Sequence, residues 1–465
     1  MPRSISESCP TRPGNTEAWP ATAFETLDLQ IQVVTPMFGG GAEAGEPDPV
    51  TLIRPSSIRG HLRFWWRATR GAACDCPKKL KQREVEIFGD TEHPSGVTLR
   101  VESVRTSRSE RCAAYGWNPQ ARRGQGGYVL RWAEALVGNG LPYALFPFQG
   151  KPPKRPVQGL DPEKVPSFMT MPFSFRIVAT IPRSHASEVR AAIWGWINFG
   201  GIGARTRRGC GTLQCGEFSP AGSNQSDIQQ WWDLGLRNLV PPTVGAAPES
   251  WPIAFRKLLV GSRNASPMTA WDRAVSILRD FRQGSGLGRN PGPQPNQPKR
   301  SRWPEPETIR KLTGQRSNGH QRMESIPDNA FPRAELGLPI VFHFKDDRMG
   351  DPQDTELYPV VADQIRGRMA SPLIMKALAA SDGTAVPLIA ALRVPALEQV
   401  VLIADREPLQ FTETPLIRHP SLATYPNSPM IRSDQRISRS SQGSAVEALM
   451  SLAQEPPYSF TEVQS

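Results

Sequence analysis

The chain has 465 residues and a formal net charge of +11 at neutral pH. Its length predicts two or three domains, because one hydrophobic core stops growing well below this size, and its charge favours an anionic partner. The first twenty residues lack the apolar run of a secretion signal, and charged residues interrupt the apolar stretch at 373–404. We therefore expect a cytoplasmic protein with no membrane contact and, since its six cysteines form no CxxC pair, no disulfides.

The N-terminal region begins with a polar segment, residues 1–23, that we expect to be weakly ordered. Residues 26–34 alternate apolar and polar side chains, which predicts a half-buried strand. A glycine cluster at 39–41 then precedes a predicted helix at 58–70, with Ser56 or Ser57 as its N-cap.

One face of this predicted helix is basic. Arg59, Arg63, Arg67 and Arg70 are spaced four, four and three residues apart, so they share a face. No acidic residue lies between Pro49 and Cys74 to neutralise them. A solvated basic face would give the same pattern, but the aligned spacing and the missing acids favour an anion-binding surface.

Three more strands and a helix follow, with a loop-rich insertion after the first strand: strands at 97–104, 171–181 and 212–218, the helix at 185–199 and the insertion at 105–165. The order strand-helix-strand, strand-helix-strand is that of the split βαβ, or ferredoxin-like, topology. We assign residues 24–220 to an N-terminal domain of this kind.

Residues 199–211, here called the glycine-arginine loop, combine five glycines with Arg205, Arg207 and Arg208 and contain no acid. Glycine lets a backbone approach a ligand closely, and arginine binds phosphate oxygens in pairs. The loop follows a helix and precedes a strand and has no Lys-Ser/Thr pair, so it is neither a Walker loop nor a dinucleotide-binding loop. The sequence predicts a polyanion-binding loop; the alternative is a simple connector.

A second domain is predicted for residues 250–435, with a strand at 253–260 and a helix at 269–282. Residues 283–304 form a Gly/Pro-rich basic loop that we expect to be mobile. A short helix at 305–312 and further elements complete an α+β unit (339–344, 386–392 and 399–403). The polar tail at 438–465 is expected to be weakly ordered. The predicted fold class is α+β, with tandem ferredoxin-like (RRM-like) domains and long loop insertions.

No metal or cofactor site is predicted. The histidines show no paired helical spacing, Cys74 and Cys76 form CxC without a second pair, and the acidic cluster at 346–354 favours a solvated loop over a Mg²⁺ site. His61 lies between two arginines of the basic helix and could act as a general acid/base on RNA. Its position nearer the apolar side of the helix favours a buried histidine instead.

Eight motifs along the chain resemble the RAMP superfamily of CRISPR proteins, and in particular the family of first subunits of the Cmr (type III-B) effector complex. They are TPMFGGG (35–41), IRPSSIRGHLRFWWRA (53–68), EIFGD (86–90), GGIGARTRRGCG (200–211), GRNPG (288–292), SRWPEPETIRKL (301–312), FPRAELGLP (331–339) and RMASPLI (368–374). The glycine-arginine loop alone indicates the superfamily, and the RPSSIRGHLRFWWR and RWPEP elements together indicate the subunit family.

The resemblance implies tandem ferredoxin-like domains and assembly with other Cmr subunits, namely RAMP backbone subunits and a neighbouring head subunit. It implies a non-catalytic protein without cofactors that holds the 3′ part of a CRISPR RNA, contacts target RNA, or does both, in antiviral defence. The RNA contacts expected from the motifs and from the basic loop are Arg54, Ser56, Arg59, Arg63, Arg67, Gly201, Gly203, Arg205, Arg207, Arg208, Arg289, Arg300, Arg302 and Trp303.

Two alternatives stay open at this point. One is a metal-independent RAMP endoribonuclease that processes CRISPR RNA with His61. The other is an assembly scaffold that does not touch RNA. For Trp303, which could stack on an RNA base, a place in the core is at least an equal expectation.

Overall fold

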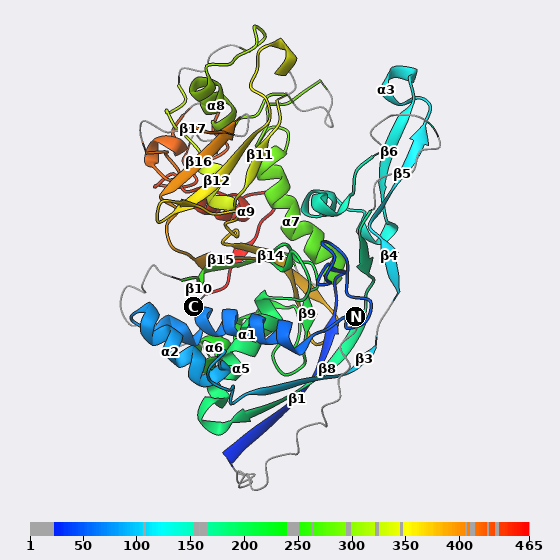
Figure 1. The fold of residues 1–465 in the computed structure, drawn as a ribbon, viewed down its shortest axis with the longest axis vertical. Coiled ribbons are helices and arrows are strands. Elements are labelled where there is room, and N and C mark those ends of the chain that lie inside the picture. The colour runs from blue at the N-terminus through cyan, green and yellow to red at the C-terminus, as the bar shows by residue number, and fades with distance from the viewer. Residues whose placement is uncertain are drawn as a thin grey trace, which may run out of the picture.

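The structure, a computed structural model, describes residues 23–105, 108–152, 158, 165–239, 251–262, 265–293, 299–320, 325–344, 347–404, 407–409, 414–425, 427–432 and 437–464. Two four-stranded antiparallel sheets and a third sheet account for most of its strands (Figure 1). The expectation for the N-terminal segment falls almost wholly outside the described residues. It stays a prediction.

The first unit is built on a sheet whose strands lie in the order β3-β8-β1-β9. In chain order its elements are β1 (Phe24–Val33), α1 (Pro55–Ala68), α2 (Pro77–Phe88), β3 (Thr98–Arg105), β8 (Phe173–Pro182), α5 (Ala186–Phe199), β9 (Leu213–Gln214) and α6 (Gln225–Leu239). β1 pairs antiparallel with β8 along its whole length, from Phe24 opposite Pro182 to Val33 opposite Phe173. Its alternate residues Leu27, Leu29 and Ile31 are buried, which confirms the half-buried strand expected from the alternation.

The second unit repeats this succession. Its elements are β10 (Ile253–Val260), α7 (Pro267–Gln283), β14 (Leu373–Ala379), β15 (Ala385–Arg393), α9 (Ala445–Gln454) and β18 (Thr461–Glu462). The strand order is β14-β15-β10-β18, again with antiparallel neighbours. The strand order and the positions of the two helices therefore match those of the first unit.

The two units are stacked in four layers. α1 and α5 lie between the first sheet and the second, and α7 and α9 cover the far face of the second sheet (Figure 1). Trp65 and Trp196 of the helices share one core with Ile374 and Leu388 of the second sheet, whereas Trp271 of α7 packs in the other core. Because both faces of the second sheet are covered, β14 and β15 are apolar at nearly every position rather than alternating.

A third sheet lies beyond α7, with its own small core. It contains β11 (Ile340–Phe342), β12 (Thr355–Val361), β13 (Gln364–Ile365), β16 (Gln399–Ala404) and β17 (Glu407–Leu409). α8 (Glu305–Thr313) packs against it through Ile309.

The insertion forms a hairpin that projects away from the two units (Figure 1). Its strands β5 (Ala113–Asn118) and β6 (Gly127–Trp132) pair with each other, and α3 (Ala121–Gly124) lies at the tip. A small sheet at the base joins β2 (Met37–Phe38), β4 (Ser109–Arg111) and β7 (Ser167–Met169), and α4 (Leu141–Ala144) follows the hairpin. Single turns of 3₁₀ helix complete the fold at Arg70–Ala73, Glu134–Leu136, Phe146–Phe148, Arg183–His185, Thr206–Arg208, Pro332–Leu336, Asp347–Met349 and Pro420–Ala423.

Two local expectations are wrong. Helix α1 begins at Pro55 with Arg54 at the N-cap and no side-chain cap, so neither Ser56 nor Ser57 caps it. Proline at the first helical position supplies the required φ and lacks the N–H that a cap would satisfy. The tail at 438–465 is not weakly ordered, because it contains α9 and β18, which complete the second sheet's unit beyond residue 435.

The start of α9 shows why this part of the tail is ordered. Ser444 accepts a hydrogen bond from the Glu447 amide at 3.2 Å, a side-chain cap at the helix N-terminus. Leu449 and Leu452 are then buried against the second unit's core. Of the helices described, none has the length and apolar character needed to cross a membrane.

Candidate nucleic-acid interface

The backbone of the glycine-arginine loop is folded so tightly that a side chain at several of its glycines would be strained or would collide with its neighbours. Gly203, Gly209 and Gly211 have positive φ, and a Cβ on Gly203 would collide with the carbonyl oxygen of Phe38. Trp196 Nε1 donates to the Gly201 carbonyl at 2.9 Å and holds the start of the loop. Gly201 and Gly203 therefore shape the loop, and their expected contact with RNA stays a prediction.

Two of the loop's three arginines reach across to the second unit. Arg207 Nη1 donates to the carbonyl of Ser371, and Arg208 Nη1 donates to that of Leu373 at 2.9 Å. In return Trp271 Nε1 of α7 donates to the Arg208 carbonyl. Burial, together with the charge of Arg205, lowers the pKa of Arg208 to about 9. These two side chains join the units, and the prediction that they contact RNA is not tested by this arrangement.

Arg207 also links the loop to α1, because its guanidinium lies over the Phe64 ring, 5.3 Å from the ring centre. The structure therefore brings together the two segments that the sequence singled out. It does so through packing between them.

Arg205 differs from its two neighbours. It adopts a left-handed conformation with φ of 57°, which is uncommon for a residue other than glycine. Its Nε is buried without a hydrogen-bond partner, and no ion pair joins it to another described residue. Burial lowers its pKa, and the charge of Arg282 at the end of α7 lowers it further. Arg205 is therefore the one arginine of the loop whose side chain has neither a hydrogen bond nor an ion pair with a described residue.

The arginine face of α1 is neutralised in part by an acidic residue beyond the acid-free stretch from Pro49 to Cys74. Glu84 of α2 is buried and accepts from Arg63 Nε at 2.5 Å and from Arg67 Nη1 at 2.6 Å. Arg54 Nη2 lies 3.5 Å from Asp48, just before the acid-free stretch. The expectation of an unneutralised face is thus wrong for Arg63 and Arg67, because their acid comes from the next helix.

Two other predicted contacts on this helix remain free. Ser56 is exposed and Arg59 is half-buried, and neither side chain has a hydrogen bond or ion pair with a described residue. Arg70, the last member of the face, donates to the carbonyl of Asn238 at 3.2 Å. Arg59 is therefore the member of the face best placed to meet an external anion.

The basic loop at 283–304 is anchored where the structure describes it. Arg302 donates to the carbonyls of Gly286 and Asn427, and Arg300 pairs with Glu307 at 3.0 Å. Trp303 is only 2 % exposed, and its Nε1 donates to the Phe281 carbonyl at 3.2 Å. Trp303 is therefore a core residue and cannot stack on a base in this conformation, which favours the alternative held open for it.

Next to this loop lies a cavity of about 460 Å³, here called the basic pocket. Its charged lining consists of six cations and one carboxylate, with two histidines: Arg282, Arg289, Lys299, Arg300, Arg310, Arg333, Asp351, His320 and His343. Of the predicted contacts, Arg289 and Arg300 lie here. Arg282 connects the pocket with the glycine-arginine loop, because its charge acts on Arg205 and Arg208 on one side and on Arg333 on the other.

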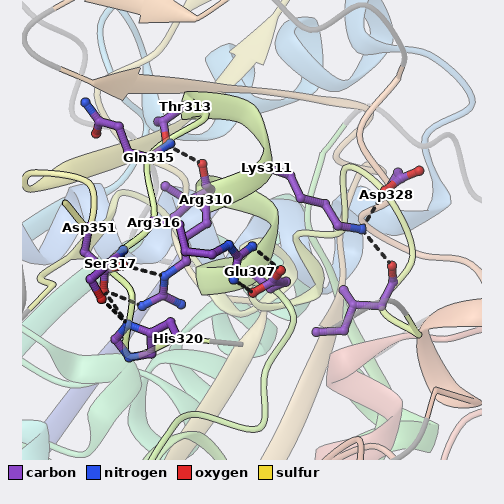
Figure 2. Close-up of polar contacts among 12 residues, drawn as sticks. Glu307, Arg310, Lys311, Thr313, Gln315, Arg316, Ser317, His320, Asp328 and Asp351 are labelled. Carbon is purple, nitrogen blue, oxygen red and sulfur yellow. Dashed lines mark hydrogen bonds and ion pairs between the residues drawn. The ribbon is translucent and has the colours of Figure 1, made fainter. Parts of the chain in front are cut away.

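A network of ion pairs, most of them buried, includes Arg310, His320 and Asp351 of the pocket's lining (Figure 2). Arg310 donates to both oxygens of Asp351, at 3.0 and 2.7 Å, and the Ser317 amide and His320 also contact this carboxylate. Burial opposes ionisation of Asp351, but the hydrogen bonds from Arg310 and Ser317 outweigh it and hold its pKa well below the ordinary value.

The other two buried carboxylates of the network are Glu305 and Glu307. Glu307 lies between Arg300 and Arg316, each with a nitrogen 3.0 Å away, and Glu305 pairs with Arg333 at 3.1 Å. Sequence reasoning missed this pocket, because its members come from segments as far apart as 282 and 351. The motifs at 301–312 and 331–339 contain Arg310 and Arg333, and these were the available signal.

His61 is half-buried, and its ring lies parallel to that of Trp196 with the centres 6.3 Å apart. Burial lowers its pKa, which favours the neutral ring. This environment fits the buried histidine better than the catalytic one. Over the stretches that the structure describes, no three His, Cys, Asp or Glu side chains gather as metal ligands would.

Comparison with known proteins shows similarity over part of the chain. The sequence profile of the RAMP superfamily matches residues 30–214. The "CRISPR system Cmr subunit Cmr1-2" of Pyrococcus furiosus is 28% identical over 190 residues, which cover 40% of this chain and 92% of that protein. Cmr1-1 of the same organism is 24% identical over 164 residues, 35% of this chain and 40% of that one.

Two solved structures are similar in outline. The apo crystal structure of Cmr1 from Pyrococcus furiosus aligns over 95% of this chain and 99% of its own, with 14% identity and a TM-score of 0.44. A chain of the type III-B Cmr-beta complex, solved by cryo-electron microscopy with cognate target RNA, aligns over 80% and 94%, with 12% identity and a TM-score of 0.43.

Proposed function

Residues 30–214 match the RAMP superfamily, and from this premise we propose that the chain is an RNA-binding, non-catalytic subunit of a Cmr-type CRISPR ribonucleoprotein. It would contact the 3′ part of the CRISPR RNA, the target RNA, or both, and assemble with RAMP backbone subunits and a neighbouring head subunit. The similarity to Cmr1-2 of Pyrococcus furiosus over nearly all of that protein supports the assignment to this class of subunit.

We infer further that both units are ferredoxin-like. In each, two βαβ halves give an antiparallel sheet in which the first and third strands are central neighbours, β1 with β8 and β10 with β15. The related RNA-recognition fold has the same kind of unit. Tandem copies would give the chain a junction between units at which RNA can lie.

The observation that carries the proposal is a group of cations at this junction with no ionic partner among the described residues. Arg205 comes from the first unit, and Arg282 comes from the second. Each has a buried Nε that makes no hydrogen bond, and the charge of Arg282 lowers the pKa of Arg205. Phosphate oxygens would satisfy both guanidinium groups at once, which favours a polyanion over a neutral ligand.

Fluorescence anisotropy with a labelled single-stranded RNA tests this proposal. We expect affinity to fall with salt, with a slope of about −0.7 in log K against log salt for each phosphate contact. The double substitution Arg205→Gln and Arg282→Gln should make the slope shallower by about 1 to 1.5 and weaken binding. The matched control is Arg100→Gln, because Arg100 is 70% exposed and lies on β3, in the first sheet. Equal losses in the two variants would contradict the site.

The same protein answers whether the subunit is catalytic. Incubated with labelled repeat RNA in EDTA, it should leave the RNA intact. Specific cleavage that His61→Ala abolishes would replace the proposal with the endoribonuclease. If the protein binds other Cmr subunits with an affinity that does not depend on salt, and has no affinity for RNA, the assembly scaffold would replace the RNA-binding proposal.

A further inference from the structure

The basic pocket contains more positive charge than its own carboxylates neutralise. Around it, seven cations face three buried acids: Arg282, Arg289, Lys299, Arg300, Arg310, Arg316 and Arg333 against Glu305, Glu307 and Asp351. Asp351 is part of the lining, whereas Glu305 and Glu307 are not, and the three acids pair with Arg300, Arg310, Arg316 and Arg333. The remaining three cations have no ion pair with a described residue.

These three cations converge from two segments. Arg282 lies in the last turn of α7, and its Nε is buried without a hydrogen bond to any residue that the structure describes. Arg289 and Lys299 lie on the two limbs of the loop after α7, which are joined by backbone hydrogen bonds between Asn290 and Lys299 and between Asn290 and Arg300. A buried guanidinium N–H without an acceptor is unfavourable, because it has lost its hydrogen bonds to water. An anion in the pocket would remove this cost.

The paired arginines of the lining fix the pocket's shape. The Arg333 guanidinium lies near two aromatic rings, 5.7 Å from the centre of the Trp303 ring and 5.3 Å from that of the Phe342 ring. The Arg310 guanidinium lies over the Phe344 ring, 5.0 Å from its centre, and donates hydrogen bonds to both carboxylate oxygens of Asp351. Paired and stacked in this way, these arginines cannot collapse into the cavity, so the site is preorganised for a ligand with charge.

We propose that the basic pocket binds a terminal phosphomonoester of an RNA strand. This step deepens the proposed function and rests on it. A terminal phosphomonoester carries a charge of about −1.5 to −2 at neutral pH, whereas a backbone phosphodiester carries a single negative charge. Three cations without ion pairs among the described residues, in one cavity, match the larger charge of the terminal phosphomonoester. A 3′-phosphate and a 5′-phosphate present the same chemistry, and the experiment separates them.

The test compares four RNAs of one sequence in the full-length protein, by competition anisotropy. They end in a 3′-phosphate, a 5′-phosphate, a phosphate at both ends or hydroxyls only. One terminal phosphate should raise the affinity for RNA about 10- to 100-fold. This range corresponds to the roughly 1.5–3 kcal/mol that hydrogen bonds to a charged group contribute to the binding free energy. The end that gives the advantage identifies the strand end in the pocket.

The variant that tests the site is the double substitution Arg289→Gln and Lys299→Gln. In this variant the affinity gained from a terminal phosphate should fall to less than about 3-fold. The matched control is Lys311→Gln, because Lys311 lies on α8 but pairs with Asp328 at 2.8 Å, away from the pocket (Figure 2). It should keep the full advantage. Urea unfolding of both variants confirms that each is folded.

The outcomes separate the two proposals. Equal affinity for phosphate-ended and hydroxyl-ended RNA overturns the pocket, and so does an advantage that survives in the double variant. If RNA still binds with the expected salt slope, the proposed function stands. Loss of all RNA affinity in the wild-type protein overturns both.

Discussion

Gly209 illustrates, at the scale of single residues, how the glycine-arginine loop depends on its contacts. Its φ of 85° lies in the left-handed region, and a Cβ there would collide with the Trp271 ring and meet the Lys376 backbone. Gly209→Ala should therefore lower the free energy of unfolding by about 2–5 kcal/mol, from backbone strain plus overpacking. Urea unfolding measures this, and Gly383→Ala is the control, since it has the same φ but open space around it. Equal losses would show that strain alone accounts for the effect.

Asp351 should contribute to stability in a way that depends on pH. Its folded-state pKa is depressed, so its contribution is complete above its ordinary value of about 4 and is lost as the pH falls further. Asp351→Asn leaves Arg310 unpaired in the interior and should cost about 3–5 kcal/mol at pH 7, and the gap to wild type should shrink under acid. Asp354→Asn, with a partner on the surface, should cost little. A constant gap from pH 7 to pH 3 would contradict this account.

At the scale of elements, β14 meets the end of α5 through a buried lysine. Lys376 Nζ donates to the Gly200 carbonyl at 2.7 Å, at the negative end of the helix, and burial lowers its pKa to about 7. Between pH 7 and about 10 the unfolded chain binds a proton that the folded chain does not. The linkage therefore makes the protein more stable as pH rises through this window.

The size of this effect is measurable. The free energy of unfolding should rise with pH by at most about 1.4 kcal/mol per unit above pH 7, and Lys376→Met should remove that part of the slope. The control is Lys81→Met, since Lys81 is exposed on α2. Unfolding curves at pH 7, 8 and 9 provide the comparison. A slope that persists in Lys376→Met would assign the dependence to another group.

On the scale of the whole molecule, α1 and α5 form one core with both sheets, whereas the third sheet has its own. We therefore expect amide hydrogens in β8 and β15 to exchange with the same opening free energy, and those in β12 and β16 with a lower one. Hydrogen exchange read by mass spectrometry resolves these strands. Separate protection for β8 and β15 would mean that the two units open independently.

Local signals in the sequence predicted much of this architecture. β10 was expected at 253–260 and lies at those residues, and α5 and α8 differ from expectation by one residue at an end. α9 was missed because polar residues surround it, although Ser444 and Glu447 carry the spacing of a capping box. β14 was missed as a strand because two covered faces remove the alternation that marks one.

The site was less predictable, because its contacts join distant parts of the chain. Arg207 and Ser371 are 164 residues apart in the sequence, and Arg63 pairs with Glu84, 21 residues later on another helix. Spacing along one helix predicted which arginines share a face. It could not predict which of them the fold would neutralise.

The pairing of β10 with β18 has a consequence during synthesis. Thr461 contacts Val260 across 201 residues, so the ribosome completes the second sheet's edge strand long after it has made the sheet's first strand. At about 5–20 residues per second, that interval is roughly 10–40 s. Until β14 and β15 have also been made within this interval, α1 and α5 lack the layer that covers them, so the nascent chain exposes apolar surface that a chaperone could cover.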